Sequence, residues 1–190
     1  MEKGKLNGHE RRLLLKIARQ AIETELEGLP FSLPKVTNPN LIEHRGAFVT
    51  LHKHGQLRGC IGTFSANRPL CEVVGDMVIS AAFKNLRFRP LGSSEFKEIN
   101  LEISALTPLM PITDINEIKI GTHGIYIIQE PFHGVLLPQV ATKNGWDRLT
   151  FLKQTCMKAG LASGCWKDQT TRINIFSAEI FGEKSEKLLS

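Results

Sequence analysis

Residues 57–64, with the sequence LRGCIGTF, strongly restrict how this chain can fold. The β-branched and aromatic residues around two glycines favour a strand over a helix. Because side chains alternate along a strand, we expect Arg58, Cys60 and Gly62 to share one face. Glycine inside a strand is tolerated where a bulge forms or another group approaches the backbone closely. The run therefore predicts that Gly59 or Gly62 marks such a place.

Two interpretations of Cys60 remain open at this point. An arginine beside a thiol lowers the pKa of the thiol and can hold an anion next to it. By contrast, an isolated cysteine on an apolar strand is usually a small buried hydrophobic residue. No neighbouring base or metal-ligand spacing accompanies Cys60 in the sequence, and either would have favoured the reactive interpretation.

A hairpin is predicted over residues 45–64, with this run as its second strand. If the connecting loop has two residues, pairing places Cys60 on the same face as Val49 and Leu51. In that arrangement the thiol lies against an apolar face of the sheet. A change of one residue in the register would move Cys60 to the opposite face.

Two histidines lie at the end of the first strand of this hairpin. In the same two-residue-loop register, His52 and His54 face the opposite way from Cys60, and the sequence leaves open whether either one sees the thiol. A His-x-His pair can chelate a metal from one strand face. No third ligand follows at a recognisable spacing, so solvent-facing histidines are favoured and no metal site is predicted.

Hydrophobic periodicity predicts three helices and several short strands in the chain. Asn7 and Asp147 are expected to cap helices, and Pro69 suits a first helical turn. The predicted helices span residues 8–27, 69–83 and 148–159, and the predicted strands span 98–107, 118–120, 125–128, 134–137 and 172–180. Because helices and strands do not alternate regularly, their order predicts an α+β fold with a largely antiparallel sheet and flanking helices.

The run 57–62 resembles the signature of the AMMECR-one domain family, and further segments match that family in the same order. These segments are 46–51 (GAFVTL), 87–88 (RF), 90–91 (PL), 101–104 (LEIS), 136–140 (LLPQV), 145–147 (GWD) and 158–161 (KAGL). The resemblance implies a two-lobed, single domain over residues 8–182. We expect residues 183–190 to form a frayed C-terminal tail.

The same resemblance marks candidate site residues. Arg58 and Cys60 are expected to line the floor of a surface cleft, with Cys60 as the catalytic thiol. The residues expected to bind a substrate or partner there are Gly59, Gly62, Arg87, Gln139, Trp146 and Asp147. For Trp146 and Asp147 the simpler interpretation is packing and helix capping.

The chain departs from the usual family pattern in the segment after the second predicted helix. Asn85 and Leu86 stand where an aspartate–proline pair is common, and Arg89 stands where a proline is common. An ion pair from that aspartate to Arg87 must therefore be absent or rebuilt. A glutamate that often completes a capping box with Asp147 is replaced by Thr150.

Two functional hypotheses follow from these residues and from the resemblance. In the first, the chain performs thiol-dependent chemistry at Cys60 while Arg58 holds an anionic substrate. In the second, it is a non-catalytic module that binds a partner protein or nucleic acid through the same cleft. The net charge of +5 permits contact with a polyanion without demanding it.

The resemblance also implies partners, since proteins of this kind are commonly encoded beside a Memo-like protein and a radical-SAM enzyme. The chain lacks the C-x-x-x-C-x-x-C cluster motif, so it is not itself the radical enzyme. No cofactor is predicted.

The four cysteines form no C-x-x-C pair, which excludes a zinc knuckle and a thioredoxin motif. Scattered cysteines of this kind fit a reducing compartment. No apolar run reaches the roughly 18 residues of a membrane span, and the first residues lack the apolar run of a signal peptide. We therefore expect a cytoplasmic protein.

Overall fold

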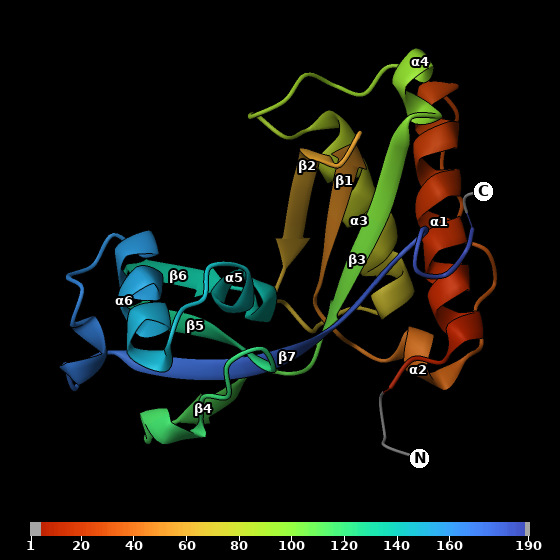
Figure 1. Ribbon diagram of the computed structural model, residues 1–190. Helices are drawn as coiled ribbons and strands as arrows, with labels where there is room; N and C mark the ends of the chain where they lie inside the picture. The colour runs from red at the N-terminus through yellow and green to blue at the C-terminus, as the bar shows by residue number, and fades with distance from the viewer. Residues whose placement is uncertain (1–4, 189–190) are drawn as a thin grey trace. The chain divides into compact units, whose positions relative to one another are not determined.

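The computed structural model describes residues 5–188 (Figure 1). The chain divides into two compact units, Met1–Leu106 with Glu179–Ser190, and Thr107–Ala178. Strands follow the order β2 (Gln56–Thr63), β1 (Ala47–Lys53), β3 (Ile99–Leu106), β7 (Arg172–Gly182), β5 (His123–Gln129) and β6 (Phe132–Leu136), with β4 (Met110–Ile112) paired to β7. The pairs β1–β2, β1–β3, β4–β7, β5–β6 and β5–β7 are antiparallel. The predicted α+β fold with a largely antiparallel sheet is confirmed.

The sheet of the first unit is built on β1 (Ala47–Lys53), which pairs with β2 (Gln56–Thr63) on one side and β3 (Ile99–Leu106) on the other. β2 is an edge strand of this sheet. The predicted hairpin is therefore confirmed, and its loop has two residues. His54 and Gly55 form this loop with φ angles of 50° and 79°, the left-handed conformation that tight hairpin turns require.

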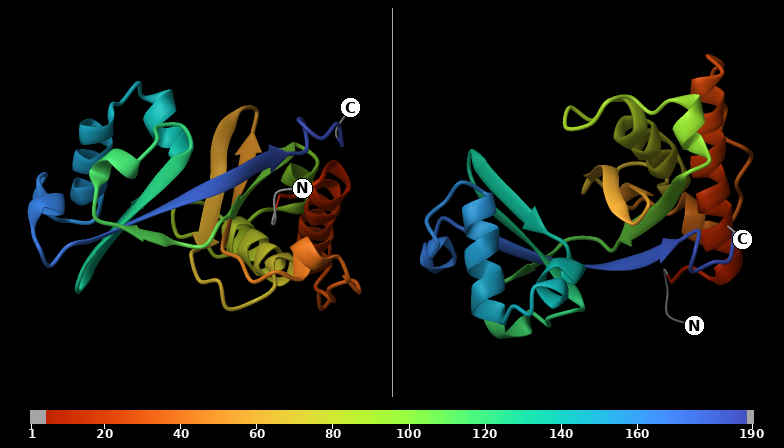
Figure 2. Two further views of the ribbon diagram at one scale, coloured as in Figure 1. Left: turned by 90° about the horizontal axis from the view of Figure 1, so that it is seen from below. Right: turned by 45° about the horizontal axis from the view of Figure 1, so that its top comes forward.

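Helices cover one face of this sheet, as Figures 1 and 2 show. α1 (Gly8–Leu26) begins at the predicted cap Asn7, whose side chain forms a reciprocal capping box with Glu10. α3 (Leu70–Phe83) packs on α1, β1 and β2. The core between helices and sheet includes Leu14, Leu15, Ile17, Ile22, Val49, Leu51, Leu70, Val74, Val78, Leu101 and Ile103.

Two single-turn helices of the first unit were not predicted. α2 (Pro39–Ile42) lies in the proline-rich stretch after α1, and α4 (Ser93–Phe96) precedes β3. Four residues are too few to show helical periodicity, so sequence patterns give little signal for such turns. α4 nevertheless matters for the site, because it carries Glu95.

The end of the chain is not frayed over residues 183–188, which corrects the expectation from sequence. Glu183 is buried, pairs with Arg19 of α1, and accepts a hydrogen bond from Leu101 N at 2.7 Å. Leu188 packs against the core of the first unit. A buried ion pair and an apolar contact hold these residues in place, whereas residues 189–190 lie outside the described part.

The second unit has a sheet of β5 (His123–Gln129), β6 (Phe132–Leu136) and β7 (Arg172–Gly182), with β4 (Met110–Ile112) on the other side of β7. The helix α6 (Arg148–Lys158) packs on β5 and β6. α5 (Pro138–Lys143) and the 3₁₀ turns η1 (Ile115–Glu117) and η2 (Cys165–Lys167) complete the unit. Its core includes Ile125, Ile127, Phe151, Leu152, Ile173 and Ile175.

The strand predicted over residues 118–120 is absent. Ile118 follows η1 and is buried in the second core, while Ile120 is exposed. Alternation of two isoleucines around a lysine was therefore a misleading strand signal. The single buried isoleucine is explained by packing alone.

Cys156 and Cys165 form a disulfide that joins α6 to η2. This bond was not predicted, because the two cysteines are nine residues apart and spacing alone does not reveal disulfide pairing. Two of the four cysteines are therefore oxidised and no longer support a reducing compartment. Cys60 and Cys71 are free thiols. None of the helices described in residues 5–188 has the length and apolarity needed to cross a bilayer.

Candidate functional site

Arg58 is held by Glu95 of α4 through two hydrogen bonds. Its Nη2 donates to Glu95 Oε2 at 2.9 Å, and its Nε donates to Glu95 Oε1 at 3.3 Å. The same Nη2 donates to the carbonyl oxygen of Arg89 at 2.9 Å. Bonds from Arg58 and from Lys53 lower the pKa of the Glu95 carboxyl from 4.5 to about 2. The guanidinium is thus already neutralised by a carboxylate of the protein.

A β-bulge determines the face of the sheet on which the Arg58 side chain lies. The register shifts between Leu51, which opposes Gly59, and His52, which opposes Leu57. Arg58 is the extra residue, and it shares its partner Glu95 with Lys53. Lys53 continues the alternation of the buried residues of β1, so Arg58 lies on the side of the sheet that the helices cover.

Cys60 lies on the opposite face, so the expectation that it shares a face with Arg58 is wrong. The bulge places Cys60 opposite Thr50 and not opposite Val49. Thr50 Oγ1 donates a hydrogen bond to Cys60 Sγ at 3.3 Å. The expected apolar neighbours of the thiol, Val49 and Leu51, are on the other side of the sheet, and Cys60 is half-buried.

The structure shows which of the two hairpin histidines shares a face with Cys60. His52 alternates with Thr50 along β1 and therefore lies on the same face as Cys60. His54 is in the hairpin turn, and its Nε2 is 2.9 Å from Glu98 Oε2. Within residues 5–188 no group of three or more His, Cys, Asp or Glu side chains is arranged to hold a metal ion.

The two glycines of the signature run allow close approach, as predicted, but the protein itself fills the space. A Cβ atom on Gly59 would lie less than 3.0 Å from the carbonyl oxygen of Ala81 in α3. A Cβ atom on Gly62 would meet the ring of Phe48 just as closely. Gly59 also adjoins the bulge. These glycines serve packing of β2, and neither leaves room for a ligand.

The segment after α3 is anchored to the signature strand by Asn85. The Asn85 side chain is buried, donates from Nδ2 to the carbonyl oxygen of Cys60 at 3.3 Å, and accepts at Oδ1 from Arg87 N at 3.0 Å. The guanidinium carbons of Arg58 and Arg87 lie 6.0 and 5.6 Å from the centre of the Phe88 ring. In place of any ion pair that an aspartate at this position could form with Arg87, the structure has an amide that binds backbone atoms of Cys60 and Arg87.

A fully exposed apolar side chain stands at the tip of this segment. Leu86 has a relative exposure of 103%, although Asn85 before it is only 8% exposed. The cationic side chains of Lys84, Arg87 and Arg89 beside it are also exposed. We call residues 84–90 the basic loop.

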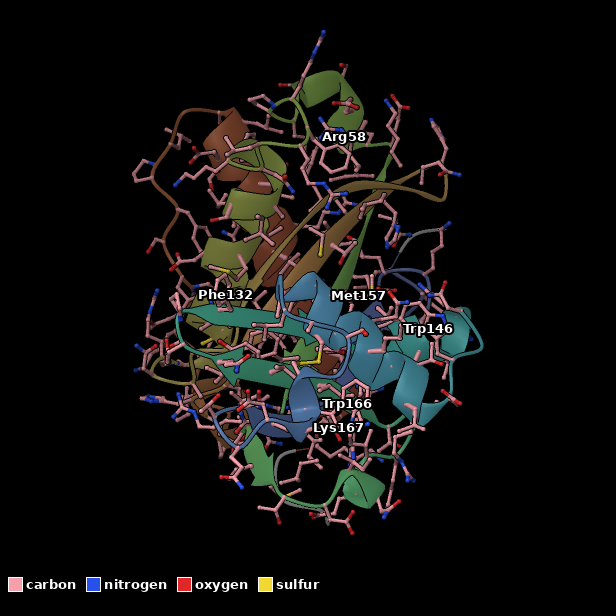
Figure 3. All side chains as sticks on the ribbon, turned by 90° about the vertical axis from the view of Figure 1, so that its left-hand side faces the viewer. Arg58, Phe132, Trp146, Met157, Trp166 and Lys167 are labelled. Atoms are coloured by element: carbon pink, nitrogen blue, oxygen red, sulfur yellow. A yellow bond between two sulfur atoms is a disulfide. The ribbon has the colours of Figure 1, made fainter. Side chains whose placement is uncertain are left out.

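The remaining candidate residues belong to the second unit. Asp147 caps α6, as predicted, and its Oδ1 accepts from Thr150 N at 2.7 Å. Bonds from Thr150 lower the pKa of the Asp147 carboxyl. Trp146, labelled in Figure 3, packs against the core of the second unit. Gln139 lies in the first turn of α5, and its buried Oε1 has no hydrogen-bond partner within residues 5–188.

The candidates therefore fall into separate groups. Arg58 and Cys60 are on opposite faces of β2, Arg87 is in the basic loop, and three further candidates are in the second unit. Glu95 was not predicted as a site residue, because no pattern in a four-residue helix points to Arg58. The anchoring role of Asn85 was not predicted either, although the departure from the family pattern at this position was a signal for it.

Comparisons with known proteins agree with the resemblance drawn from the signature run. The sequence model of the AMMECR1 family matches residues 15–181. A protein of Methanothermobacter thermautotrophicus is 42% identical over 194 residues, which cover 96% of this chain and 99% of that protein. Protein NEQ441 of Nanoarchaeum equitans is 39% identical over 177 residues, which cover 90% of this chain and 98% of that protein.

The fold is similar to a solved structure of comparable size. The crystal structure of the uncharacterized protein PH0010 from Pyrococcus horikoshii matches with a TM-score of 0.84 and 38% sequence identity. The match covers 92% of this chain and 91% of that chain. It confirms the fold.

Proposed function

Since the chain belongs to the AMMECR1 family, whose members named above carry no stated activity, we propose a function from its own side chains. We propose that it is a non-catalytic module that binds an acidic partner protein through the basic loop. The observation that carries this proposal is Leu86, which is fully exposed while its neighbour Asn85 is fixed to the signature strand.

The loop has the composition and the anchoring of a protein-binding segment. An exposed leucine gains free energy only when a partner covers it, and arginine is enriched at protein interfaces. Because Asn85 binds Cys60 and Arg87, little conformational entropy is lost when the loop docks. The exposed cations beside Leu86 favour an acidic partner.

A protein partner is favoured over nucleic acid by the same side chain. Single-stranded nucleic acid is held by cations together with aromatic rings on which bases stack. At the tip of the basic loop the exposed side chain is aliphatic, and Phe88 is already covered by Arg58 and Arg87. An aliphatic tip gains more from an apolar depression on a protein surface.

The family association supplies the first partner to test. We propose that the chain acts in a cytoplasmic pathway with a Memo-like protein and a radical-SAM enzyme, and that the basic loop binds one of these two. Calorimetric titration of each partner from the same genome is the direct test. Leu86→Ser should weaken binding about tenfold or more, as for a central contact.

Leu29→Ser is the matched control, because Leu29 is also an exposed leucine of the first unit, at 55%. It should bind as the wild type does. Equal binding by Leu86→Ser and wild type would overturn the role of the loop. If single-stranded RNA binds and Leu86→Ser weakens that binding, the basic loop binds nucleic acid and not a protein.

Thiol-dependent chemistry at Cys60 is the second candidate. It is supported by a half-buried free thiol that receives a hydrogen bond from Thr50 and shares its sheet face with His52. Arg58 does not support it, because Arg58 is bound to Glu95 on the other side of the sheet. If anionic substrates are bound, another group must hold them.

Alkylation of each free cysteine across a pH series separates the two candidates. Burial raises the pKa of the Cys71 thiol, so Cys71 is an internal reference for an inert thiol. A reactive Cys60 should be alkylated at neutral pH far faster than Cys71. Normal pathway activity of Cys60→Ser in cells would exclude thiol chemistry and leave the binding module.

A further inference from the structure

The first unit has a hollow of about 330 Å³ that the candidate residues above do not use. It lies on the face of the sheet away from the helices, over β1, β3 and the end of β7. Its lining includes His52, Asn100, Glu102, Ile180, Lys184 and Ser185. All of these belong to the same compact unit.

Register places the polar side chains of this hollow next to one another. His52 of β1 is directly opposite Asn100 of β3, and Thr50 is directly opposite Glu102. Asn100 and Glu102 are two residues apart on one strand, so they point to the same face. The alternation predicted for residues 98–107 therefore supplies a polar stripe on the open face and an apolar stripe toward the core.

The hollow contains polar groups that the described chain leaves unsatisfied. Asn100 Nδ2 is buried and has no acceptor within residues 5–188. Glu102 is half-buried, and no ion pair or hydrogen bond joins its carboxylate to any described side chain. A buried donor and a half-buried charge without partners both cost free energy, and a bound molecule can remove that cost.

Lys184 adds a cation to the lining of the hollow. Ser185 Oγ bonds to both the N and the O of Gly182 at 2.9 Å, which fixes the turn that carries Lys184. Lys184 is exposed and forms no ion pair with Glu102 or any other carboxylate of residues 5–188. The hollow thus holds one carboxylate and one ammonium group that do not neutralise each other.

We propose that this hollow binds a free apolar α-amino acid. Its carboxylate accepts from Asn100 Nδ2 and pairs with Lys184, and its ammonium group pairs with Glu102. A zwitterion with adjacent charges is the small molecule that satisfies both signs at once. Ile180, which is 40% exposed, gives the hollow an apolar surface for the side chain.

Isothermal titration of the full-length protein with L-leucine, L-isoleucine, L-methionine and L-phenylalanine tests this site. At least one of them should bind saturably with a dissociation constant of about 1 mM or tighter. For L-leucine, isopentylamine lacks the carboxylate and 4-methylpentanoate lacks the ammonium group. Each should bind about tenfold or more weakly than the best amino acid, because a hydrogen bond or pair to a charged group is lost.

Variants test which residue binds the ammonium group of the ligand and which binds its carboxylate. Glu102→Gln should weaken binding of the amino acid and of isopentylamine, without changing that of 4-methylpentanoate. Lys184→Gln should have the reverse selectivity. Glu25→Gln, on an exposed position of α1 away from the hollow, is the matched control and should bind as the wild type does. Thermal unfolding of each variant verifies that it is folded.

Absence of saturable binding by all four amino acids to the folded wild type would overturn the proposal. So would equal affinities of the amino acid for wild type and Glu102→Gln. Binding of isopentylamine as tightly as L-leucine would show a simple cation site instead. These outcomes do not depend on the basic loop, so the loop and the hollow succeed or fail separately.

Discussion

Asn85 binds the main chain of Cys60 through the one side-chain group that an aspartate would lack. Asn85 Nδ2 donates to the carbonyl oxygen of Cys60 at 3.3 Å, while Oδ1 accepts from Arg87 N at 3.0 Å. An amide carries a donor and an acceptor, whereas an ionised carboxylate only accepts. The asparagine therefore ties an edge strand to the loop beside it. This hydrogen bond anchors one end of the basic loop to the signature run.

Asn85→Asp should weaken this link. The substitution keeps the acceptor for Arg87 N but replaces the donor to Cys60 by a second acceptor, in a side chain that is only 8% exposed. We expect a loss of about 1–3 kcal/mol in the free energy of unfolding, measured by urea denaturation. Asn67→Asp, in an exposed loop, is the control and should change stability little. Equal stability of both variants would show that the bond to Cys60 contributes nothing.

The Arg58–Glu95 pair should make stability depend on acid pH. The pKa of Glu95 is lowered to about 2 in the folded chain, below its ordinary value, so the folded state favours the carboxylate. The stabilisation is complete above about pH 5 and is lost as the pH falls toward 2. Because the Glu95 side chain is 26% exposed, we expect only about 1–2 kcal/mol after solvent screening.

Glu95→Gln removes this dependence. The difference in unfolding free energy between wild type and Glu95→Gln should be largest near pH 6 and shrink below about pH 4.5. Denaturant titrations at several pH values measure it, with Glu25→Gln as the exposed control. A difference that stays constant from pH 6 to pH 3 would mean that the lowered pKa of Glu95 is wrong.

Gly59→Ala should destabilise the first unit through overpacking. The new Cβ would be closer to the carbonyl oxygen of Ala81 than real Cβ atoms come, and that carbonyl belongs to the backbone of α3. We expect a cost of about 1–3 kcal/mol in thermal or urea unfolding. Gly92→Ala is the matched control, because no atom lies within 4 Å of its Cβ position. If both variants melt alike, the close approach of α3 to β2 is not required.

Sequence patterns predicted the regular elements of this fold well and its irregular ones poorly. Asn7 and Asp147 cap the helices that they were expected to cap, since capping depends on a residue type at one position. The faces of β2 were misassigned, although a bulge or close approach was predicted at a signature glycine. A bulge moves every later residue to the other face, and its position depends on pairing that a single strand does not reveal.

The residues of the candidate site show the same limit of prediction from sequence. Arg58 and Cys60 were correctly identified as neighbours in one strand, but the bulge separates them onto opposite faces. The partner of Arg58 is Glu95, which lies 37 residues away in the sequence. Contacts between distant residues leave no periodic signal in one sequence. The polar stripe of Asn100 and Glu102, by contrast, follows directly from strand alternation.

Asp147 offers a test that separates capping from a functional charge. Its Oδ1 accepts from Thr150 N at 2.7 Å at the start of α6. Asp147→Ala should lower the free energy of unfolding by about 0.5–2 kcal/mol, while Asp147→Asn should lose much less, because asparagine caps nearly as well. Urea denaturation of the two variants measures this difference. If both variants are as stable as the wild type but both lose partner binding, the carboxylate of Asp147 belongs to a binding surface and its capping contact is incidental.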